Sequence, residues 1–318
     1  MVGMNRRRAV ALLAASAAFT IRATRVDAQS PRLSLMTAGK GSAFLPYGQG
    51  IAAVLTAAGI QVDVKESKGS NENLSAVDVS PTTIGAAFLG SAFDALRGDG
   101  FAAGTRHENV RALFPMYETA FMAAALASRG ISSIGALNGR RVGCGPANGP
   151  AEGYFRAVIE IAGVTPVIVG GAPADQAKQL VNGEIDAFWQ GASVLIPSLV
   201  SATNTVDCVV FGLAKDEIAE MRKRFPFMAD AAYPAGTYRG QTAKVETVAA
   251  WNVVIAHKDL DEGLAYRITK AVLAAKDLPT TAGAAASSTN AANASKNTVV
   301  PYHPGAIRAL AELGVKIQ

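Results

Sequence analysis

Residues 33–65, LSLMTAGKGSAFLPYGQGIAAVLTAAGIQVDVK, alternate between strand-like and helix-like patterns. The apolar run Leu33–Thr37 predicts a short strand, and a glycine-rich loop follows it. Residues 46–58 predict a helix, and the alternation over Gln61–Lys65 predicts a second strand. Strands that alternate with helices in this way are typical of an α/β protein with a parallel sheet.

The same alternation continues and then restarts in a second group. Further strands are predicted at 83–89, 141–144, 165–169, 185–189 and 247–256, with helices after Gly69 and at 91–96, 151–162, 174–181 and 262–275. Extended segments at 111–116 and 121–128 separate the groups, and residues 282–298 are predicted to be a loop or weak helix. We therefore predict two lobes, with chain crossings near 117–121 and 246–251. Lobe I would comprise residues 29–118 and 250–318, and lobe II residues 119–249.

The N-terminus explains most of the basic charge. Residues 1–28 combine three arginines at positions 6–8, an apolar stretch and the small-residue site Val26-Asp27-Ala28, which together predict a cleaved signal peptide. A short buried N-terminal helix is the alternative. Cleavage after Ala28 would remove five arginines and one aspartate, which lowers the formal charge of the 318-residue chain from +5 to +1. We therefore expect export to the periplasm and no nucleic-acid partner.

The composition narrows the function classes further. Half of the residues are hydrophobic and 17% are charged, which excludes a disordered protein. After the signal region we find no apolar run of about 18 residues, so no membrane insertion is expected. Metalloprotease, nucleophile-elbow, phosphate-loop and Cys-x-x-Cys motifs are missing, and His107, His257 and His303 have no partner at ligand spacing. We therefore predict no catalytic residue, metal or cofactor. Cys144 and Cys208 would be either paired or free and buried.

Four loops rich in Gly, Ser and Asn each follow a predicted strand and precede a helix: residues 39–44, 68–73, 90–91 and 145–152. In open α/β sheets, ligands bind beyond the carboxyl ends of strands, where helix N-termini suit a carboxylate. One such loop alone is an ordinary turn and helix cap. Four in an exported two-lobed chain predict a ligand cleft between the lobes.

The predicted ligand contacts come from these loops and from the ends of two later segments. Ser42, Ser70 and Asn73 can donate hydrogen bonds, and Gly41 and Gly149 allow close approach of the backbone. The full predicted set is Gly41, Ser42, Phe44, Ser70, Asn71, Asn73, Ser91, Asn148, Gly149, Gln190 and Tyr238. We expect the ligand's charge to be held mainly by amides and hydroxyls.

Seven stretches in this order resemble a known family: TAGKGSAFLPYG (37–48), KGSNENL (68–74), LNGRRVG (137–143), GEIDAF (183–188), FPF (225–227), PAGTYRGQ (234–241) and HPGA (303–306). They cover nearly all of the mature chain. The chain resembles the TAXI family (TRAP-associated extracytoplasmic immunogenic), the solute-binding subunits of TRAP transporters. This resemblance implies a two-lobed periplasmic binding fold. It also implies a small organic anion as ligand, glutamate and related dicarboxylates above all, and delivery to a sodium-coupled permease.

The sequence departs from the family at three places. Asn148-Gly149-Pro150-Ala151 lacks the usual Ser and Thr, Phe88-Leu89-Gly90 replaces a polar stretch, and Gly191 follows Gln190 where a hydroxyl residue is common. Hydrogen bonds to charged groups contribute roughly 1.5–3 kcal/mol each. Losing hydroxyls and gaining Phe88, Leu89 and Trp189 favours a monocarboxylate with an apolar or aromatic body. If backbone amides and Asn148 replace the hydroxyls, a glutamate-like ligand remains.

Two other functions stay open at this point. A ligand sensor that hands its occupied form to a membrane receptor would have the same fold and cleft. A secreted enzyme could use Glu72, Glu118 or Glu152 for acid–base chemistry, but the sequence offers no convincing pair with separated pKa values. Transport-associated binding is therefore the leading interpretation.

Overall fold

A computed structural model describes residues 32–317 of the chain. The predicted signal peptide lies outside these residues. The strands are β1 (Leu33–Met36), β2 (Val62–Lys65), β3 (Thr83–Phe88), β4 (Val110–Leu126), β5 (Arg141–Gly143), β6 (Val167–Val169), β7 (Ala187–Ala192), β8 (Cys208–Phe211), β9 (Ala229–Tyr233) and β10 (Val245–His257). The α-helices are α1 (Phe44–Ala57), α2 (Ser70–Asp78), α3 (Leu89–Arg97), α4 (Pro150–Ala162), α5 (Pro173–Val181), α6 (Pro197–Thr205), α7 (Lys215–Arg224), α8 (Glu262–Leu273), α9 (Leu278–Ala282) and α10 (Pro304–Glu312).

All ten strands belong to one sheet, in the order β2-β1-β3-β10-β4-β7-β5-β6, with β8 on β4 and β9 on β10. Strands β1, β2 and β3 pair in parallel, as do β5, β6 and β7. The antiparallel pair β4 and β10 lies between these two parallel groups. The predicted α/β fold class is confirmed.

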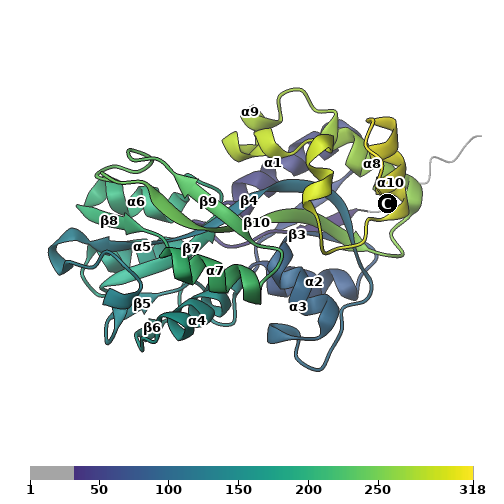
Figure 1. Cartoon of the computed structure of the whole chain (residues 1–318). Coiled ribbons are helices and arrows are strands. Elements are labelled where there is room, and N and C mark those ends of the chain that lie inside the picture. Colours follow the sequence, from purple (N-terminus) through teal and green to yellow (C-terminus); the bar gives the residue numbers. More distant parts are fainter. Residues whose placement is uncertain (1–31, 318) are drawn as a thin grey trace, which may run out of the picture. The chain divides into compact units, whose positions relative to one another are not determined.

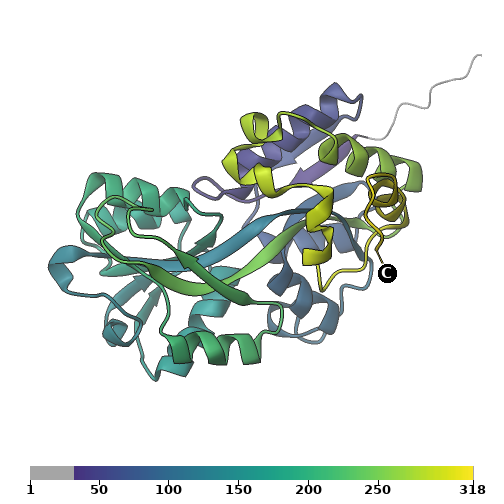
Figure 2. The ribbon, with the colours of Figure 1, turned by 45° about the horizontal axis from the view of Figure 1, so that its top comes forward.

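Strands β4 and β10 join two groups of elements (Figures 1 and 2). Half A contains α1–α3, β1–β3 and α8–α10, and half B contains α4–α7 and β5–β9. One end of β10 pairs with β3 in half A, whereas residues 245–249 pair with β9 in half B. The segments 111–116 and 121–128 are therefore not separate, because 118–120 continue the pairing of β4 with β10. The predicted lobe boundaries at 118/119 and 249/250 stay a prediction.

The ladder between β4 and β10 is irregular at the middle of both strands. From Trp251 to Val253, β10 advances two residues while β4 advances three, from Glu118 to Pro115. Proline has no N–H to donate, so within a sheet it is tolerated at such a bulge. The side chain of the intervening Asn252 donates to the carbonyl oxygen of Tyr117 at 2.7 Å. A polar side chain thus replaces backbone pairing where the two halves meet.

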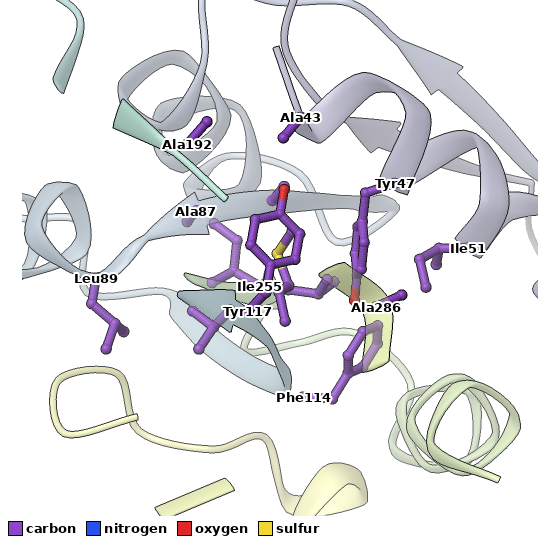
Figure 3. Packing of buried hydrophobic residues seen from close by; sticks show 14 of the residues in the cluster. Ala43, Tyr47, Ile51, Ala87, Leu89, Phe114, Tyr117, Ala192, Ile255 and Ala286 are labelled. Carbon is purple, nitrogen blue, oxygen red and sulfur yellow. The ribbon is translucent and has the colours of Figure 1, made fainter. Parts of the chain in front are cut away.

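The core of half A contains a segment that the sequence only weakly defines. Residues 284–288 and 291–296 form 3₁₀ turns, and Ala286 and Ala294 are buried. Tyr47 and Tyr117 pack edge to face at 5.1 Å, beside Phe114 and Ala286 (Figure 3). The Tyr47 hydroxyl lies 2.8 Å from the Thr289 hydroxyl, which donates to the Met116 carbonyl at 2.9 Å. Small residues let this segment pack closely against β4, next to α9, which packs on α1.

Half B contains a second, aromatic core. The ring of Phe121 stacks on Trp189 at 5.6 Å and contacts Phe88 and Tyr154 at 5.5 and 5.3 Å. Cys144 and Cys208 are both buried and both free, so the disulfide alternative is wrong. No helix within residues 32–317 is long and apolar enough to cross a membrane.

Candidate functional site

A cavity of about 520 Å³ lies between half A and half B. Ligand sites are typically concave, mostly apolar and of this size. Seventeen of its 24 lining residues are Ala, Gly, Pro or Phe. The other seven are polar: Ser42, Ser67, Lys68, Ser70, Thr119, Gln190 and Asn252. Residues far apart in the chain therefore form one apolar chamber with few polar groups.

Two helices of each half begin at this cavity, α1 and α2 in half A and α4 and α5 in half B, and Phe88 before α3 also lines it. The residues that precede α1, α2, α4 and α5 are Ala43, Gly69, Gly149 and Ala172. Their side chains cannot accept hydrogen bonds from the first backbone N–H groups, as Ser, Thr, Asp or Asn would. Helix starts carry partial positive charge and exposed N–H donors. The arrangement therefore suits an anion.

Asn73 on α2 fixes the loop that carries part of this wall. Its buried amide donates to the carbonyl oxygens of Thr37 and Ala86 at 2.7 and 2.8 Å, and it accepts from the Ser67 hydroxyl at 2.6 Å. The Ser67 hydroxyl also accepts from the N–H of Gly69 at 3.0 Å. One side chain thus ties β1, β3 and the cavity loop together.

Gln176 has the same role in half B. Its fully buried side chain accepts from the N–H of Gly145 at 2.8 Å and donates to the carbonyl of Val169 at 2.8 Å. These bonds hold the loop before α4 against the end of β6. The helix starts on both sides of the cavity are therefore positioned by buried amides.

One buried polar atom of the cavity wall, the Nε2 of Gln190, has no partner within the described chain, although the Oε1 of the same side chain accepts from the N–H of Gly191 at 3.2 Å. The Tyr117 hydroxyl also has no partner within the described chain; Tyr117 does not line the cavity, but its hydroxyl points toward Ala43, which does (Figure 3). Burial, and then the nearby Tyr47, raises the pKa of Tyr117 well above its ordinary value, so the hydroxyl keeps its proton. A buried donor without an acceptor costs about 1–3 kcal/mol, which a ligand acceptor would recover.

Charged side chains are nearly absent from the cavity wall. Lys68 is the one charged residue among those that line it, and its side chain is exposed. Glu72 lies outside and accepts from the backbone N–H of Lys68 at 3.0 Å. Glu152 also lies outside and forms an ion pair with Arg156. The ligand's charge would therefore meet backbone and neutral donors.

The third glutamate considered for acid–base chemistry, Glu118, does not line the cavity either. Desolvation raises its pKa, while Lys296 and a hydrogen bond with Tyr233 act in the opposite direction. Across residues 32–317, no three His, Cys, Asp or Glu side chains gather where they could hold a metal ion.

The structure brings four of the predicted contacts to the cavity wall, namely Ser42, Phe44, Ser70 and Gln190. Phe88, which the sequence analysis associated with ligand binding, also lines it, whereas Leu89 and Trp189 belong to the core. The Ser70 hydroxyl already accepts from the N–H of Phe88 at 2.9 Å, which anchors the end of β3.

The other predicted contacts lie elsewhere. Asn73 is a buried scaffold residue, and the Tyr238 hydroxyl is 2.9 Å from the N–H of Ile196, away from the cavity. Gly41 lies against Ala174 at the start of α5. Asn71, Ser91, Asn148 and Gly149 line a second cavity of about 680 Å³. The Asn71 amide donates to the Asn148 carbonyl at 2.6 Å, which links the two halves directly.

Three parts of the wall were not predicted from the sequence. Thr119 and Asn252 come from the crossing strands, and no local motif marks them. Residues 170–173 form the third part. Their Gly-Gly-Ala-Pro sequence follows a predicted strand and precedes a helix, which is the same signal that identified the other loops.

The second cavity contains Asp94, whose pKa is raised to about 6 by desolvation and then by repulsion from Asp99. Its ordinary value is 3.8. The folded protein therefore binds this proton more tightly than the unfolded chain, and the contribution to stability decreases as pH rises from about 4 to about 6. We expect Asp94→Asn to raise the melting temperature relative to wild type by an amount that grows over this range and then levels off. Calorimetry at several pH values checks this, and a difference that does not vary with pH would contradict it.

Comparisons with known proteins agree with this description. The NMT1-like family matches residues 35–314. No curated protein matches the chain. Among solved structures, the periplasmic binding protein BugD is similar with a TM-score of 0.54 and 12% identity, covering 91% of this chain and 99% of that one. MatC from Rhodopseudomonas palustris, solved with bound malate, gives a TM-score of 0.52 and 14% identity over 79% of this chain and 87% of its own. These likenesses show the two-lobed fold of periplasmic binding proteins.

Proposed function

Since this chain belongs to the NMT1-like family, we propose that it is a periplasmic solute-binding protein that captures a small organic carboxylate between its two lobes. The cavity between half A and half B is the proposed site. Four helices that start there carry the proposal, and in none of them does the side chain of the preceding residue cap the helix. They offer N–H donors and partial positive charge from both halves to one anion.

Gln190 gives the site a specific polar contact. Its side chain is only 5% exposed, and Nε2 has no acceptor within residues 32–317. An oxygen atom of the ligand would satisfy it. Ser42 lies at the start of α1, where its hydroxyl accepts from the N–H of Phe44 at 3.2 Å and leaves its own proton free to donate to the ligand.

Export and delivery complete the proposal. The predicted signal peptide supports export, and the resemblance to TAXI proteins supports a TRAP-type permease as the partner that receives the ligand. The lobes would close around the ligand through β4 and β10, because these strands contact both halves. Ligand contacts to both halves at once stabilise such a closed state.

The test begins with protein purified from the periplasm of its own cells. Mass spectrometry of the small molecules released on denaturation should identify a carboxylate. Gln190→Met should weaken binding of that compound about tenfold, because it removes a hydrogen bond to a charged group. Isothermal calorimetry measures the change.

Gln49→Met is the matched control, since Gln49 is exposed on α1 and does not line the cavity. Its affinity should equal that of wild type. Recovery of neutral compounds alone, or equal affinity of Gln190→Met and wild type, would contradict the proposed site. Co-purification of a membrane permease with the loaded protein tests the delivery step separately.

A further inference from the structure

The cavity is larger than a compact dicarboxylate requires. Glutamate has about ten non-hydrogen atoms, which fill at most roughly 300 Å³ even at the ~30 Å³ that each water molecule takes in the liquid. The cavity measures about 520 Å³. Its wall is made largely of small residues, so the remaining space is enclosed by Ala, Gly and Pro. A ligand with a bulkier apolar body would fill it.

Three phenylalanines give this space an aromatic wall. Phe44 is half-buried at the start of α1, and its ring lies 6.4 Å from that of Tyr117. Phe88 and Phe121 meet edge to face at 5.5 Å, and both line the cavity although each residue is only 2% exposed. Aromatic rings pack favourably on one another in offset or edge-to-face arrangements. The wall therefore suits a flat ring.

Gly191 sets the position of this wall. A Cβ atom at Gly191 would lie 2.3 Å from a ring carbon of Phe121, so only glycine leaves room for the ring in its present place. Trp189 stacks on the Phe121 ring, and Phe88 and Tyr154 also contact it. A larger residue at 191 would displace the ring from this position. Glycine at position 191, where the TAXI family commonly has a hydroxyl residue, is therefore what allows Phe121 to form part of the wall.

The neutral donors and helix starts of the cavity converge on one carboxylate, and no buried cationic side chain among the lining residues is available for a second one. Lys68 is the one charged side chain among the lining residues. A second buried carboxylate would lose its hydration without a paired charge, which is unfavourable. We propose, on the premise that this cavity is the ligand site, that the ligand is an aryl monocarboxylate whose ring packs on Phe88 and Phe121, and that Gly191 is the residue that determines this specificity.

The test uses a panel of simple compounds with the full mature protein, measured by isothermal calorimetry. The probes are 2-naphthoate, its neutral amide, octanoate, L-glutamate and malate. We expect 2-naphthoate to bind at least tenfold more tightly than glutamate, malate or the amide. Octanoate should bind at least about threefold more weakly than 2-naphthoate, because octanoate has no ring to pack on the phenylalanines.

Variants test the role of the wall. Gly191→Ala should weaken 2-naphthoate binding at least tenfold. Gly153→Ala is the control, because Gly153 lies on α4 and a Cβ there would have no neighbour within 4 Å. Phe121→Leu is the second variant and removes the ring without adding volume. It should weaken 2-naphthoate binding at least fivefold. If Gly191→Ala does not fold, as judged by circular dichroism, Phe121→Leu decides.

The outcomes separate this inference from the proposed function. Tighter binding of glutamate or malate than of 2-naphthoate would overturn the aryl monocarboxylate and leave carboxylate binding intact. Equal binding of octanoate, or an unchanged affinity in Phe121→Leu, would overturn the aromatic wall. Equal binding of the naphthoate and its amide, or no binding of any carboxylate, would instead contradict the proposed function itself.

Discussion

Replacing Asn73 with alanine is expected to lower the free energy of unfolding by about 3 kcal/mol and the melting temperature by roughly 6–12 °C. The side chain is fully buried and bonds to Thr37, Ala86 and Ser67. Alanine would leave two carbonyl oxygens and a hydroxyl without this partner in the interior. Calorimetric or chemical unfolding of the empty protein measures the loss.

Asn71→Ala is the matched control on the same helix. Asn71 is only partly buried, and its amide makes one bond, to the Asn148 carbonyl in half B. We expect this variant to change the melting temperature of the empty protein by little. Equal melting temperatures for the Asn73 and Asn71 variants would contradict the assignment of Asn73 as the residue that ties β1 and β3 to the cavity loop.

Gly41→Val is expected to weaken carboxylate binding about 100-fold. Gly41 has φ of +83°, and a Cβ atom there would lie 2.8 Å from the backbone nitrogen of Ala174 and 2.9 Å from its Cβ. A side chain would therefore hold the two halves apart at the start of α5. If the side chain raises the free energy of the binding-competent arrangement by about 3 kcal/mol, the population of that arrangement falls about 100-fold. Isothermal calorimetry with the recovered carboxylate measures it.

Gly163→Val separates backbone strain from the contact between halves. Gly163 also has a positive φ, of +66°, but a Cβ atom there would have no neighbour within 4 Å. Both variants carry the cost of a β-branched residue in this conformation, so both should lose stability. The Gly41 variant alone should lose affinity. If both bind alike, the approach of Gly41 to Ala174 has no part in ligand capture.

The fold could be predicted from the sequence because its strands and helices alternate with clear periodicity and glycine-rich boundaries. The strand predicted at 83–89 is β3, and the helix predicted at 151–162 is α4 within one residue. Helix α7 was not predicted, since its sequence Lys215–Arg224 is strongly polar and buries little beyond Ile218 and Met221. The segment 282–298 is ordered only by long-range contacts, such as that of Thr289 with Tyr47.

The site could be predicted only in part, for a related reason. Strand–glycine–helix patterns locate loops at the cavity, and Ser42, Phe44 and Ser70 were found in this way. The pattern does not tell which side chains of a loop face the ligand. Asn73 and Tyr238 carry the right chemistry for a ligand but use it within the scaffold. Asn252 was missed because its position depends on the irregular pairing of two distant strands.

The four helix starts at the cavity also affect the protein when it is empty. Half A and half B each present two ends of the same partial charge to the other, and like charges repel. Glu72, Glu152 and Asp175 lie in the first turns of α2, α4 and α5 and offset part of this repulsion, and the remainder works against closure of the empty protein. A carboxylate between them acts as a shared counter-ion and turns repulsion into attraction. The ligand's charge would then be the trigger of closure as well as its anchor, and neutral compounds of the same shape would enter the cavity without shutting it.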